Sequence, residues 1–595
     1  MSIMKMKKGM KKILLASLFL LTAKYSCLFS QDAGLEKLSN YNTTWTSVLP
    51  GTALCEPEVT SYGFCLATDA RNLMGFSSTG KLLWEKNIGR VRKISLTALR
   101  GDFILFHDQN SNIIKLFNPS GSEIWSKSLD FKPAAKPFAG RDGRFFIHGD
   151  GNVVCYGING IIRWKIKTGS QKSLPIQELP DGSIIVFLAD QDGKTKGLRL
   201  SPFGEQLEDI TFAGSITNCF TCSEGILLIF TDGSAGLFSI TEGLTQSRWV
   251  TSVKVGNPMF IINQDRTDFR LLSLSPSDVT VYKINVSDGT EAASWRINGI
   301  NGNALLKTDF SDTGIFLADS QKAVLIDSEG KELWAARMPD TVKNKTVNQI
   351  VYLKDNYLVF CSKNWSMNAY HTSQSTSKYN GGKTVNKNIQ ADYSSFAPVD
   401  LSEINYYSQG GFYPSIKNSE REAQIKKGNY GALEKEWLTQ TLSIARLYYL
   451  DSTSSDFGTR MEKSVFSTDS AGLEAILVQL SLLCTNSTQA ACADIISRSN
   501  NKFYCRAIMA NIYGYDPDGK LLSAIEKNAE LAGTKDSVYC NIICDAVYSI
   551  CLFMGRPAYN KQGKDIIKRF MGVNYSSNTR TYARDTLKKI ISLEL

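Results

Sequence analysis

The sequence is poor in the residues that most hydrolases and zinc enzymes need. Only three of its 595 residues are histidines, His107, His148 and His371. With so few imidazoles, a Ser–His–Asp triad or a histidine-based zinc site is hard to assemble. His107 and His148 each stand directly before an expected turn, at equivalent positions of a sequence repeat described below. We expect each side chain to pack inside its own repeat unit. These counts argue against an enzyme of either class, and we expect no catalytic, cofactor or metal residues.

The 13 cysteines include no adjacent pair, which excludes a vicinal disulfide. Cys219 and Cys222 form a Cys-x-x-Cys pair on an expected strand, whereas a redox pair needs a helix N-terminus to depress the thiol pKa. A local Cys219–Cys222 disulfide or two free thiols remain open there. Cys55 and Cys65 share one expected hairpin and could bridge in an oxidising compartment. Three further cysteines follow one helix face, which favours a buried core stripe over a metal site: Cys540, Cys544 and Cys551.

No apolar run is long enough to span a bilayer. Residues 13–23 form an apolar run behind a lysine-rich start, which predicts a secretory signal over residues 1–30. Cleavage between Ser30 and Gln31 fits best, with Ala23 as the alternative. A lipid anchor at Cys27 is not expected, because Lys24 stands where a lipobox needs a bulky apolar residue.

The chain has a formal net charge of +10, but residues 1–30 hold six lysines and no acid. The remainder is therefore close to +4, spread along the chain. A nucleic-acid binder needs a concentrated basic face, so we expect no nucleic-acid partner. Nine basic residues do gather between Arg556 and Lys589, as a solvated helix face or as a surface for an acidic partner.

What the sequence has in abundance is a repeat in which a tryptophan follows a glycine by four residues. Four copies are complete: Gly80 with Trp84, Gly121 with Trp125, Gly160 with Trp164, and Gly330 with Trp334. Three weaker copies lie between them: Gly204 near Leu207, Gly243 with Trp249, and Gly289 with Trp295. The six steps from Gly80 to Gly330 average about 42 residues. A period of about 40–50 residues that carries short strands is typical of a propeller.

Each glycine stands between two short apolar strands, where it supplies the positive φ of a hairpin turn. A second turn, one strand earlier, carries an aspartate such as Asp108, Asp232 or Asp319. An aspartate there can accept a hydrogen bond from the backbone two residues further on. Each unit therefore has four strands and forms one blade. We expect the tryptophans to pack between adjacent blades.

The count of blades depends on both ends of the repeat region. The strand at Trp45 has no strands before it, and residues 349–370 supply three strands without a fourth. Pairing the Trp45 strand with these three would close the ring and leave no open edge. The sequence therefore predicts eight blades. Seven is the alternative, if residues 349–370 belong elsewhere.

The Gly-x-x-x-Trp signature resembles that of the PQQ-like β-propeller repeat family, over roughly residues 41–370. The quinoprotein dehydrogenases of this family hold their cofactor with a vicinal disulfide and long inter-strand insertions, and this sequence has neither. It is more similar to the non-catalytic, BamB-like branch, whose members are scaffolds of outer-membrane assembly. That resemblance implies a protein-binding role.

The period changes after residue 370. Residues 371–418 are polar and aperiodic, which indicates a linker. From residue 419 to 595 apolar residues recur at helical spacing, as in Leu521, Leu522 and Ile525. We expect roughly nine helices in a HEAT-like α-solenoid, with an irregular bundle as the alternative.

These features favour an exported, non-enzymatic protein-interaction scaffold, periplasmic or extracellular, in cell-envelope assembly or maintenance. Its expected partners are other envelope or secreted proteins. A propeller that binds a small ligand or glycan in its central funnel is one alternative. A divergent quinoprotein-like enzyme is the other. The fold alone does not decide among them.

Overall fold

The computed structural model describes residues 44–372 and 481–594, with short gaps. The gaps are residues 142, 169–173, 180–181, 190–193, 201–203, 205, 223, 241, 263–268, 312–313, 338–346, 354–355, 482–483 and 499–501. The expected signal with Cys27, Ser30 and Gln31, nearly all of the linker, and the helices expected before residue 481 lie outside the described residues.

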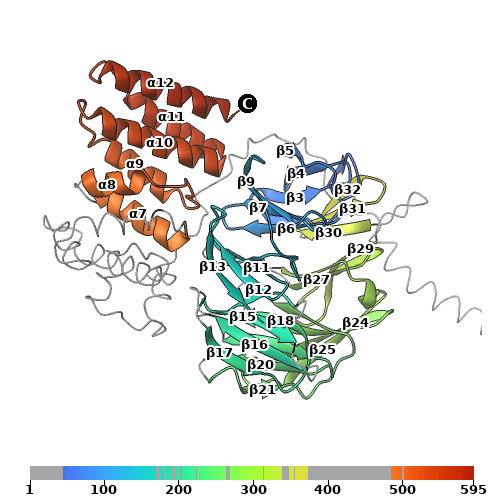
Figure 1. Ribbon diagram of the computed structural model, residues 1–595. Helices are drawn as coiled ribbons and strands as arrows, with labels where there is room; N and C mark the ends of the chain where they lie inside the picture. The colour runs from blue at the N-terminus through green and yellow to red at the C-terminus, as the bar shows by residue number, and fades with distance from the viewer. Residues whose placement is uncertain are drawn as a thin grey trace, which may run out of the picture.

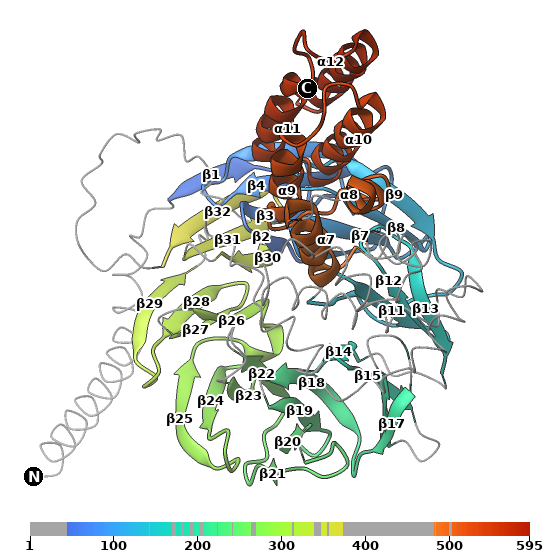
Figure 2. The same cartoon turned by 90° about the vertical axis from the view of Figure 1, so that its left-hand side faces the viewer.

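Residues 44–372 form eight four-stranded antiparallel sheets arranged as blades around a ring (Figures 1 and 2). The first blade consists of β2 (Glu58–Thr60), β3 (Gly63–Ala67), β4 (Asn72–Ser77) and β5 (Leu82–Asn87), and the second of β6 (Ile94–Leu99), β7 (Phe103–Asp108), β8 (Ile113–Phe117) and β9 (Glu123–Ser128). The third blade consists of β10 (Phe138–Ala139), β11 (Phe145–Gly149), β12 (Asn152–Tyr156) and β13 (Ile162–Lys167), and the fourth of β14 (Gln177–Glu178), β15 (Ile184–Ala189), β16 (Thr195–Leu200) and β17 (Gln206–Thr211).

The next three blades are β18 (Ile216–Cys222), β19 (Gly225–Phe230), β20 (Ala235–Ser239) and β21 (Trp249–Val250); β22 (Pro258–Ile262), β23 (Phe269–Leu274), β24 (Asp278–Ile284) and β25 (Glu291–Asn298); and β26 (Lys307–Ser311), β27 (Gly314–Ala318), β28 (Lys322–Ile326) and β29 (Glu332–Arg337). A short 3-10 helix, η1 (Gly302–Ala304), links the sixth blade to the seventh.

The eighth blade closes the ring with strands from both ends of the repeat region. Its inner strands are β30 (Val347–Tyr352), β31 (Tyr357–Ser362) and β32 (Ser366–His371), and its outermost strand is β1 (Trp45–Val48). β1 pairs with β32 so that Trp45 lies opposite Ala369. The expected eight-bladed closure through the Trp45 strand is confirmed, and the seven-bladed alternative is wrong.

The aspartate turns have the predicted hydrogen bonds. The Oδ1 atom of Asp108 accepts from the backbone N–H of Asn110 at 3.0 Å, and Asp319 accepts from Gln321 at 2.7 Å. These bonds close the turn between the second and third strands of a blade. That turn lies at one face of the ring, together with the links between blades, and the other two turns of each blade lie at the opposite face.

The described C-terminal residues form six helices: α7 (Asn486–Arg498), α8 (Lys502–Met509), α9 (Lys520–Ala529), α10 (Ser537–Met554), α11 (Pro557–Arg569) and α12 (Ser577–Ser592). Consecutive helices form hairpins, and α7, α9 and α11 pack as one layer while α8, α10 and α12 pack as the other. This two-layer stack of hairpins is the arrangement of an α-solenoid. The C-terminal helical region expected from the sequence is therefore confirmed.

Asp516 lies just ahead of α9. Its carboxylate accepts hydrogen bonds from the backbone N–H groups of Leu521 and Leu522 at 3.1 and 2.8 Å. It thereby satisfies donors that the first turn of a helix leaves free, and burial raises its pKa to about 6. α9 begins at Lys520, and Pro517 lies in the turn that precedes it.

Candidate functional site

The repeated tryptophans and glycines meet between neighbouring blades. A Cβ atom on Gly289 would lie 2.5 Å from the Trp249 ring of the preceding blade, well inside van der Waals contact. The same pairing joins Trp45 to Gly80, Trp84 to Gly121, Trp125 to Gly160, Trp164 to Gly204, and Trp295 to Gly330. Each glycine thus provides a positive φ for its hairpin and room for the indole ring.

Two repeat positions differ from this pattern. The blade before Gly243 has no tryptophan, and a Cβ atom on Gly243 would meet only the Thr245 hydroxyl, at 3.9 Å. Trp334 belongs to the seventh blade and is buried against the eighth, whose outer strand comes from the start of the chain. These residues build the ring, and their contacts give them a structural role.

His107 and His148 are both buried, at the same place in β7 and β11 of adjacent blades. Neither ring nitrogen of His107 has a hydrogen-bond partner among the described residues. Burial lowers the pKa of His107 to about 4, so its imidazole is neutral at pH 7. His371 ends β32 and packs edge-on against Tyr357.

Neither disulfide left open by the sequence is formed. Cys219 and Cys222 lie three residues apart on β18, so their side chains point to opposite faces of the sheet and into different hydrophobic clusters. Cys55 and Cys65 pack in the same hydrophobic cluster between the first two blades, and both are free thiols. Burial raises the pKa of Cys55 to about 12, which leaves its thiol protonated and unreactive.

The cysteines of α10 are core residues, as their spacing indicated. Cys540, Cys544 and Cys551 are buried in the cluster that fills the helical region. From the sequence we expect no apolar run long enough to span a bilayer, but α10 has the length and apolarity of a membrane span, as no other helix in the described part of the chain does. In this structure 56% of it is buried inside the protein. Among the residues that the structure describes, no group of three His, Cys, Asp or Glu side chains could hold a metal ion.

The basic residues near the C-terminus are largely paired. Arg569 forms ion pairs with Glu526 and Glu530, and three lysines pair with acids of their own region: Lys564 with Glu594, Lys568 with Asp565, and Lys588 with Asp585. This pairing fits a solvated helix face. Arg556 differs, because its side chain is buried.

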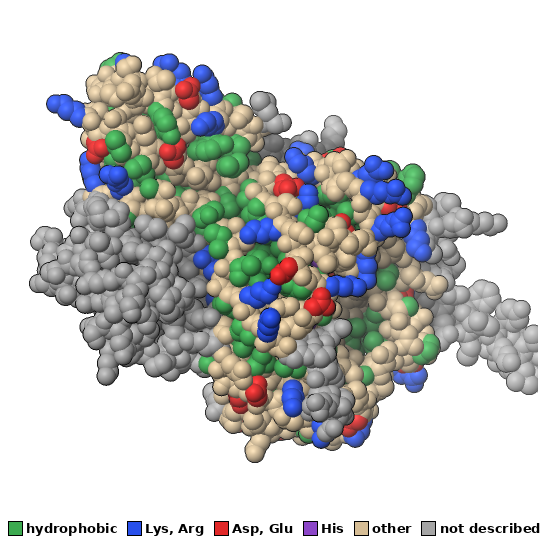
Figure 3. Space-filling model, viewed as in Figure 1, with side chains coloured by type: hydrophobic (Ala, Val, Ile, Leu, Met, Phe, Trp, Pro, Cys, Tyr) green, Lys and Arg blue, Asp and Glu red, His purple; other side chains and the backbone are tan. Residues whose placement is uncertain are grey.

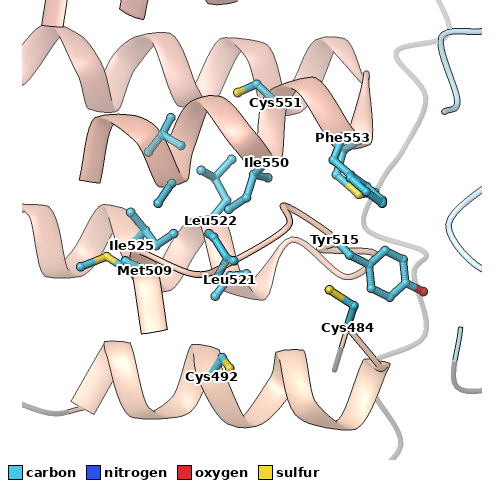
Figure 4. Packing of buried hydrophobic residues seen from close by; sticks show 14 of the residues in the cluster. Cys484, Cys492, Met509, Tyr515, Leu521, Leu522, Ile525, Ile550, Cys551 and Phe553 are labelled. Atoms are coloured by element: carbon cyan, nitrogen blue, oxygen red, sulfur yellow. The ribbon is translucent and has the colours of Figure 1, made fainter. Parts of the chain in front are cut away.

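The helical region is docked on the second and third blades, and the contact has an apolar centre. The Phe103 ring at the start of β7 packs against Tyr515 and Phe553, with centroids 5.9 and 5.1 Å away. In Figure 4, Tyr515 and Phe553 lie at the end of the helical region that faces the propeller. Through these rings the core between the two blades is continuous with the helical core. Figure 3 shows hydrophobic side chains continuing across this junction.

A buried ion pair flanks the apolar centre. The Arg556 guanidinium donates to the Asp102 carboxylate at 2.7 Å and to the Gly101 carbonyl at 2.8 Å. Asp102 lies in the β6–β7 turn and also accepts from the backbone N–H of Ser61 at 2.7 Å, in the first blade. The two charged side chains are 4% and 11% exposed, so this pair is largely removed from water. Asp102 therefore ties two blades and the helical region together.

Asn118 joins the repeat hairpin of the second blade to α10. Its side-chain oxygen accepts from the backbone N–H groups of Ser120 and Ser122, which closes the hairpin turn. Its amide nitrogen donates to the Leu552 carbonyl at 3.0 Å, in the last turn of α10. Asp327 makes the same hairpin bonds in the seventh blade but has no amide to donate. The second blade is thus specialised to hold a helix end.

The β6–β7 turn, which carries Asp102, makes another polar contact with the helical region through Arg100. Its guanidinium lies 3.5 Å from the Asp518 carboxylate. With the Asn486 amide oriented so that its oxygen faces Arg100, that oxygen accepts two hydrogen bonds and its nitrogen donates to Tyr515. These contacts connect the starts of α7 and α9 to the propeller and fix the helical region as one body with it.

Sequence reasoning missed this interface. Arg556 was one of nine basic residues on an expected solvated face, and nothing in the sequence singled out Asp102. The second repeat hairpin begins with Asn118, where the first, third and seventh begin with Ser77, Gly157 and Asp327, but nothing in this difference identified α10 as the partner.

Comparison with known proteins finds a family model that matches part of the chain. Residues 37–195 match the family model described as outer membrane protein assembly factor BamB. No curated protein matches the chain. Similar solved structures include BamB from Moraxella catarrhalis, with 12% identity over 56% of this chain and 99% of that one and a TM-score of 0.42. Saccharomyces cerevisiae Sqt1 has 10% identity over 56% and 98%, with a TM-score of 0.41.

The computationally designed Ika8 protein is a third such structure, with 14% identity over 55% of this chain and 98% of that one and a TM-score of 0.42. At these low scores, the fold assignment rests on the blades themselves and on the sequence match. The Gly-x-x-x-Trp repeats, the eight closed blades and the match over residues 37–195 identify residues 44–372 as a PQQ-like β-propeller with a helical region docked on it.

Proposed function

We propose that this protein is an exported, non-enzymatic scaffold that binds other proteins of the cell envelope and serves in its assembly or maintenance. The observation that carries the proposal is the docked helical region, because one face of the propeller already works as a protein-binding platform within the chain. The match to a family described as an outer-membrane assembly factor supports the envelope setting.

The repeat hairpins offer further protein-binding positions around the ring. Ile124, just before the tryptophan of the second blade, packs against the cluster shared with the helical region. The corresponding residues of the first and seventh blades, Leu83 and Leu333, are 45% and 48% exposed. Leu82 and Ile162, one residue earlier in their blades, are 43% and 49% exposed. Exposed apolar side chains on a rigid frame are suited to a protein partner.

The chemistry of the described residues supports a role without catalysis. Burial lowers the pKa of His107 against the opposing effect of the Asp108 charge and keeps its imidazole neutral, and burial raises the pKa of the Cys55 and Cys65 thiols and so makes them less reactive. Active sites instead shift a pKa toward the working pH with a charge partner in a cleft. A quinone cofactor would give an absorption band in the purified protein, and we expect none.

Site-specific crosslinking in the source cells tests the scaffold. A photo-reactive residue at Leu83 or Leu333 should give a discrete adduct with an envelope protein, and one at the exposed Lys527 of α9 should not. The proposal would be overturned if neither Leu83 nor Leu333 gave an adduct, or if Lys527 gave the same adduct in equal yield. A bound glycan or quinone in the purified protein would then favour the funnel-binding or enzymatic alternative.

A further inference from the structure

The face of the propeller opposite the helical region carries a basic surface at its first and eighth blades. It is formed by the β3–β4 turn, the β5–β6 link and the β31–β32 turn, which all lie at that face. Six exposed cations belong to it and form no ion pair within the described residues: Arg71, Lys86, Arg90, Arg92, Lys93 and Lys363. We call these six residues, with Val48 and Trp365, the open-face patch.

Backbone hydrogen bonds show that the parts of the patch are contiguous. The Trp365 carbonyl accepts from the N–H of Leu49 at 2.7 Å, directly after Val48. The same segment continues to Thr52, whose carbonyl accepts from the N–H of Asp69 at 3.0 Å. The Arg71 carbonyl accepts from the N–H of Ile88 at 2.9 Å, at the start of the link that carries Arg90 and Arg92. Figure 3 shows Lys and Arg side chains gathered on the side of the propeller away from the helices, over β5 and β32.

The patch also presents two exposed apolar side chains. Val48 is 80% exposed and Trp365 is 51% exposed. Trp365 has a φ of 69°, in the left-handed region. Asn112 and Gly151 take that conformation in the corresponding turns of the second and third blades. A bulky aromatic residue is unfavourable there, so nothing in the turn itself explains a tryptophan that points into solvent.

The charges nearby leave the patch strongly positive. Acidic residues at the same face of the ring include Asp69, Glu85 and Asp108, against the six cations of the patch. Asp69 accepts from the Thr52 N–H, and Asp108 accepts from the Asn110 N–H and the Ser111 hydroxyl, so both carboxylates serve local turns. The fourth to seventh blades, from residue 169 to 337, have more acidic than basic residues.

We propose that the open-face patch binds the surface of an anionic phospholipid membrane. The cations are spread over loops of two blades, as suits a broad charged surface more than a single acidic peptide. Tryptophan is favoured at the level of lipid headgroups, and each Lys or Arg near an anionic leaflet adds to binding. In this orientation the helical region and the outer hairpins face away from the lipid. The inference does not depend on the scaffold role.

Vesicle flotation with the full chain tests the proposal. We expect binding to vesicles of phosphatidylcholine with 30% phosphatidylglycerol, weakening as salt is added, and none to phosphatidylcholine alone. Reversing Arg90 and Arg92 to glutamate should weaken binding by at least about twentyfold, since each cation near the surface contributes roughly fivefold. Trp365→Ser should weaken it severalfold.

The matched control reverses two exposed cations elsewhere, Lys331→Glu and Lys527→Glu, and should bind within about threefold of the unchanged protein. Unchanged thermal unfolding of each variant shows that the fold is intact. No binding to anionic vesicles, or equal loss in both double variants, would overturn the proposal. Capture of an acidic protein through Arg90 and Arg92 without vesicle binding would also overturn it.

Discussion

Replacing Gly289 by alanine should destabilise the propeller much more than the same change at Gly243. Both glycines occupy the hairpin turn of a blade with similar φ values, 74° and 87°. Alanine in the left-handed region therefore costs about 1 kcal/mol at either position. The two sites differ in what the new methyl group meets, so they form a matched pair.

At Gly289 the methyl group would lie 2.5 Å from a ring carbon of Trp249. That ring is 6% exposed, and its Nε1 donates to the Val286 carbonyl at 2.7 Å, so the ring cannot move aside freely. Overpacking of this kind costs about 1–3 kcal/mol. We therefore expect Gly289→Ala to cost about 3 kcal/mol in total, against about 1 kcal/mol for Gly243→Ala.

Urea unfolding of the full chain, followed by circular dichroism in the β-sheet region, measures both costs. The second step is a double-mutant cycle. In a Trp249→Ala background the ring is gone, so adding Gly289→Ala should cost only the backbone term of about 1 kcal/mol. Equal costs for the two single alanine variants, or an unchanged cost of Gly289→Ala without the ring, would refute the packing explanation of the repeat.

Three further changes test the interface and the buried histidine. Asn118→Asp keeps the oxygen that closes the hairpin but loses the donor to the Leu552 carbonyl and places a negative charge at the helix C-terminus; it should release the helical region to limited proteolysis while the propeller stays intact. Arg556→Ala leaves Asp102 buried without its partner and should cost about 3 kcal/mol, whereas Arg569→Ala removes only exposed pairs and should cost less than about 1 kcal/mol in the same urea experiment. Lowering the pH from 7 to 5 should remove about 2 kcal/mol of stability through His107, because the unfolded imidazole takes up a proton near pH 6.5 and the folded one only near pH 4; His107→Leu should abolish that part of the pH dependence.

The repeat made the propeller predictable from the sequence. The glycine and tryptophan have separate physical roles at most blade junctions, so both recur even where the spacing between them changes from four to six residues. The closing strand at Trp45 could be assigned because an unpaired blade edge is unfavourable. The helical nature of the C-terminal region was predictable from the spacing of its apolar residues.

The interface was not predictable, because its two halves lie far apart in the chain. Asp102 and Arg556 are separated by 454 residues, and each belongs to a local pattern with an ordinary explanation. Asn118 also satisfies its own hairpin, so its second bond leaves no mark in the sequence. Only the fold shows that one repeat hairpin differs in function from the others.

Quantitative affinity capture from the source cells tests the scaffold role most directly. Full-length protein would be compared with a variant carrying Leu82→Glu and Leu83→Glu, and with the control Leu531→Glu, an exposed residue after α9. We predict that a discrete set of envelope proteins is captured by the unchanged protein and the control, and is lost with the hairpin variant. Equal capture by all three, or capture of no discrete protein, would contradict the scaffold role.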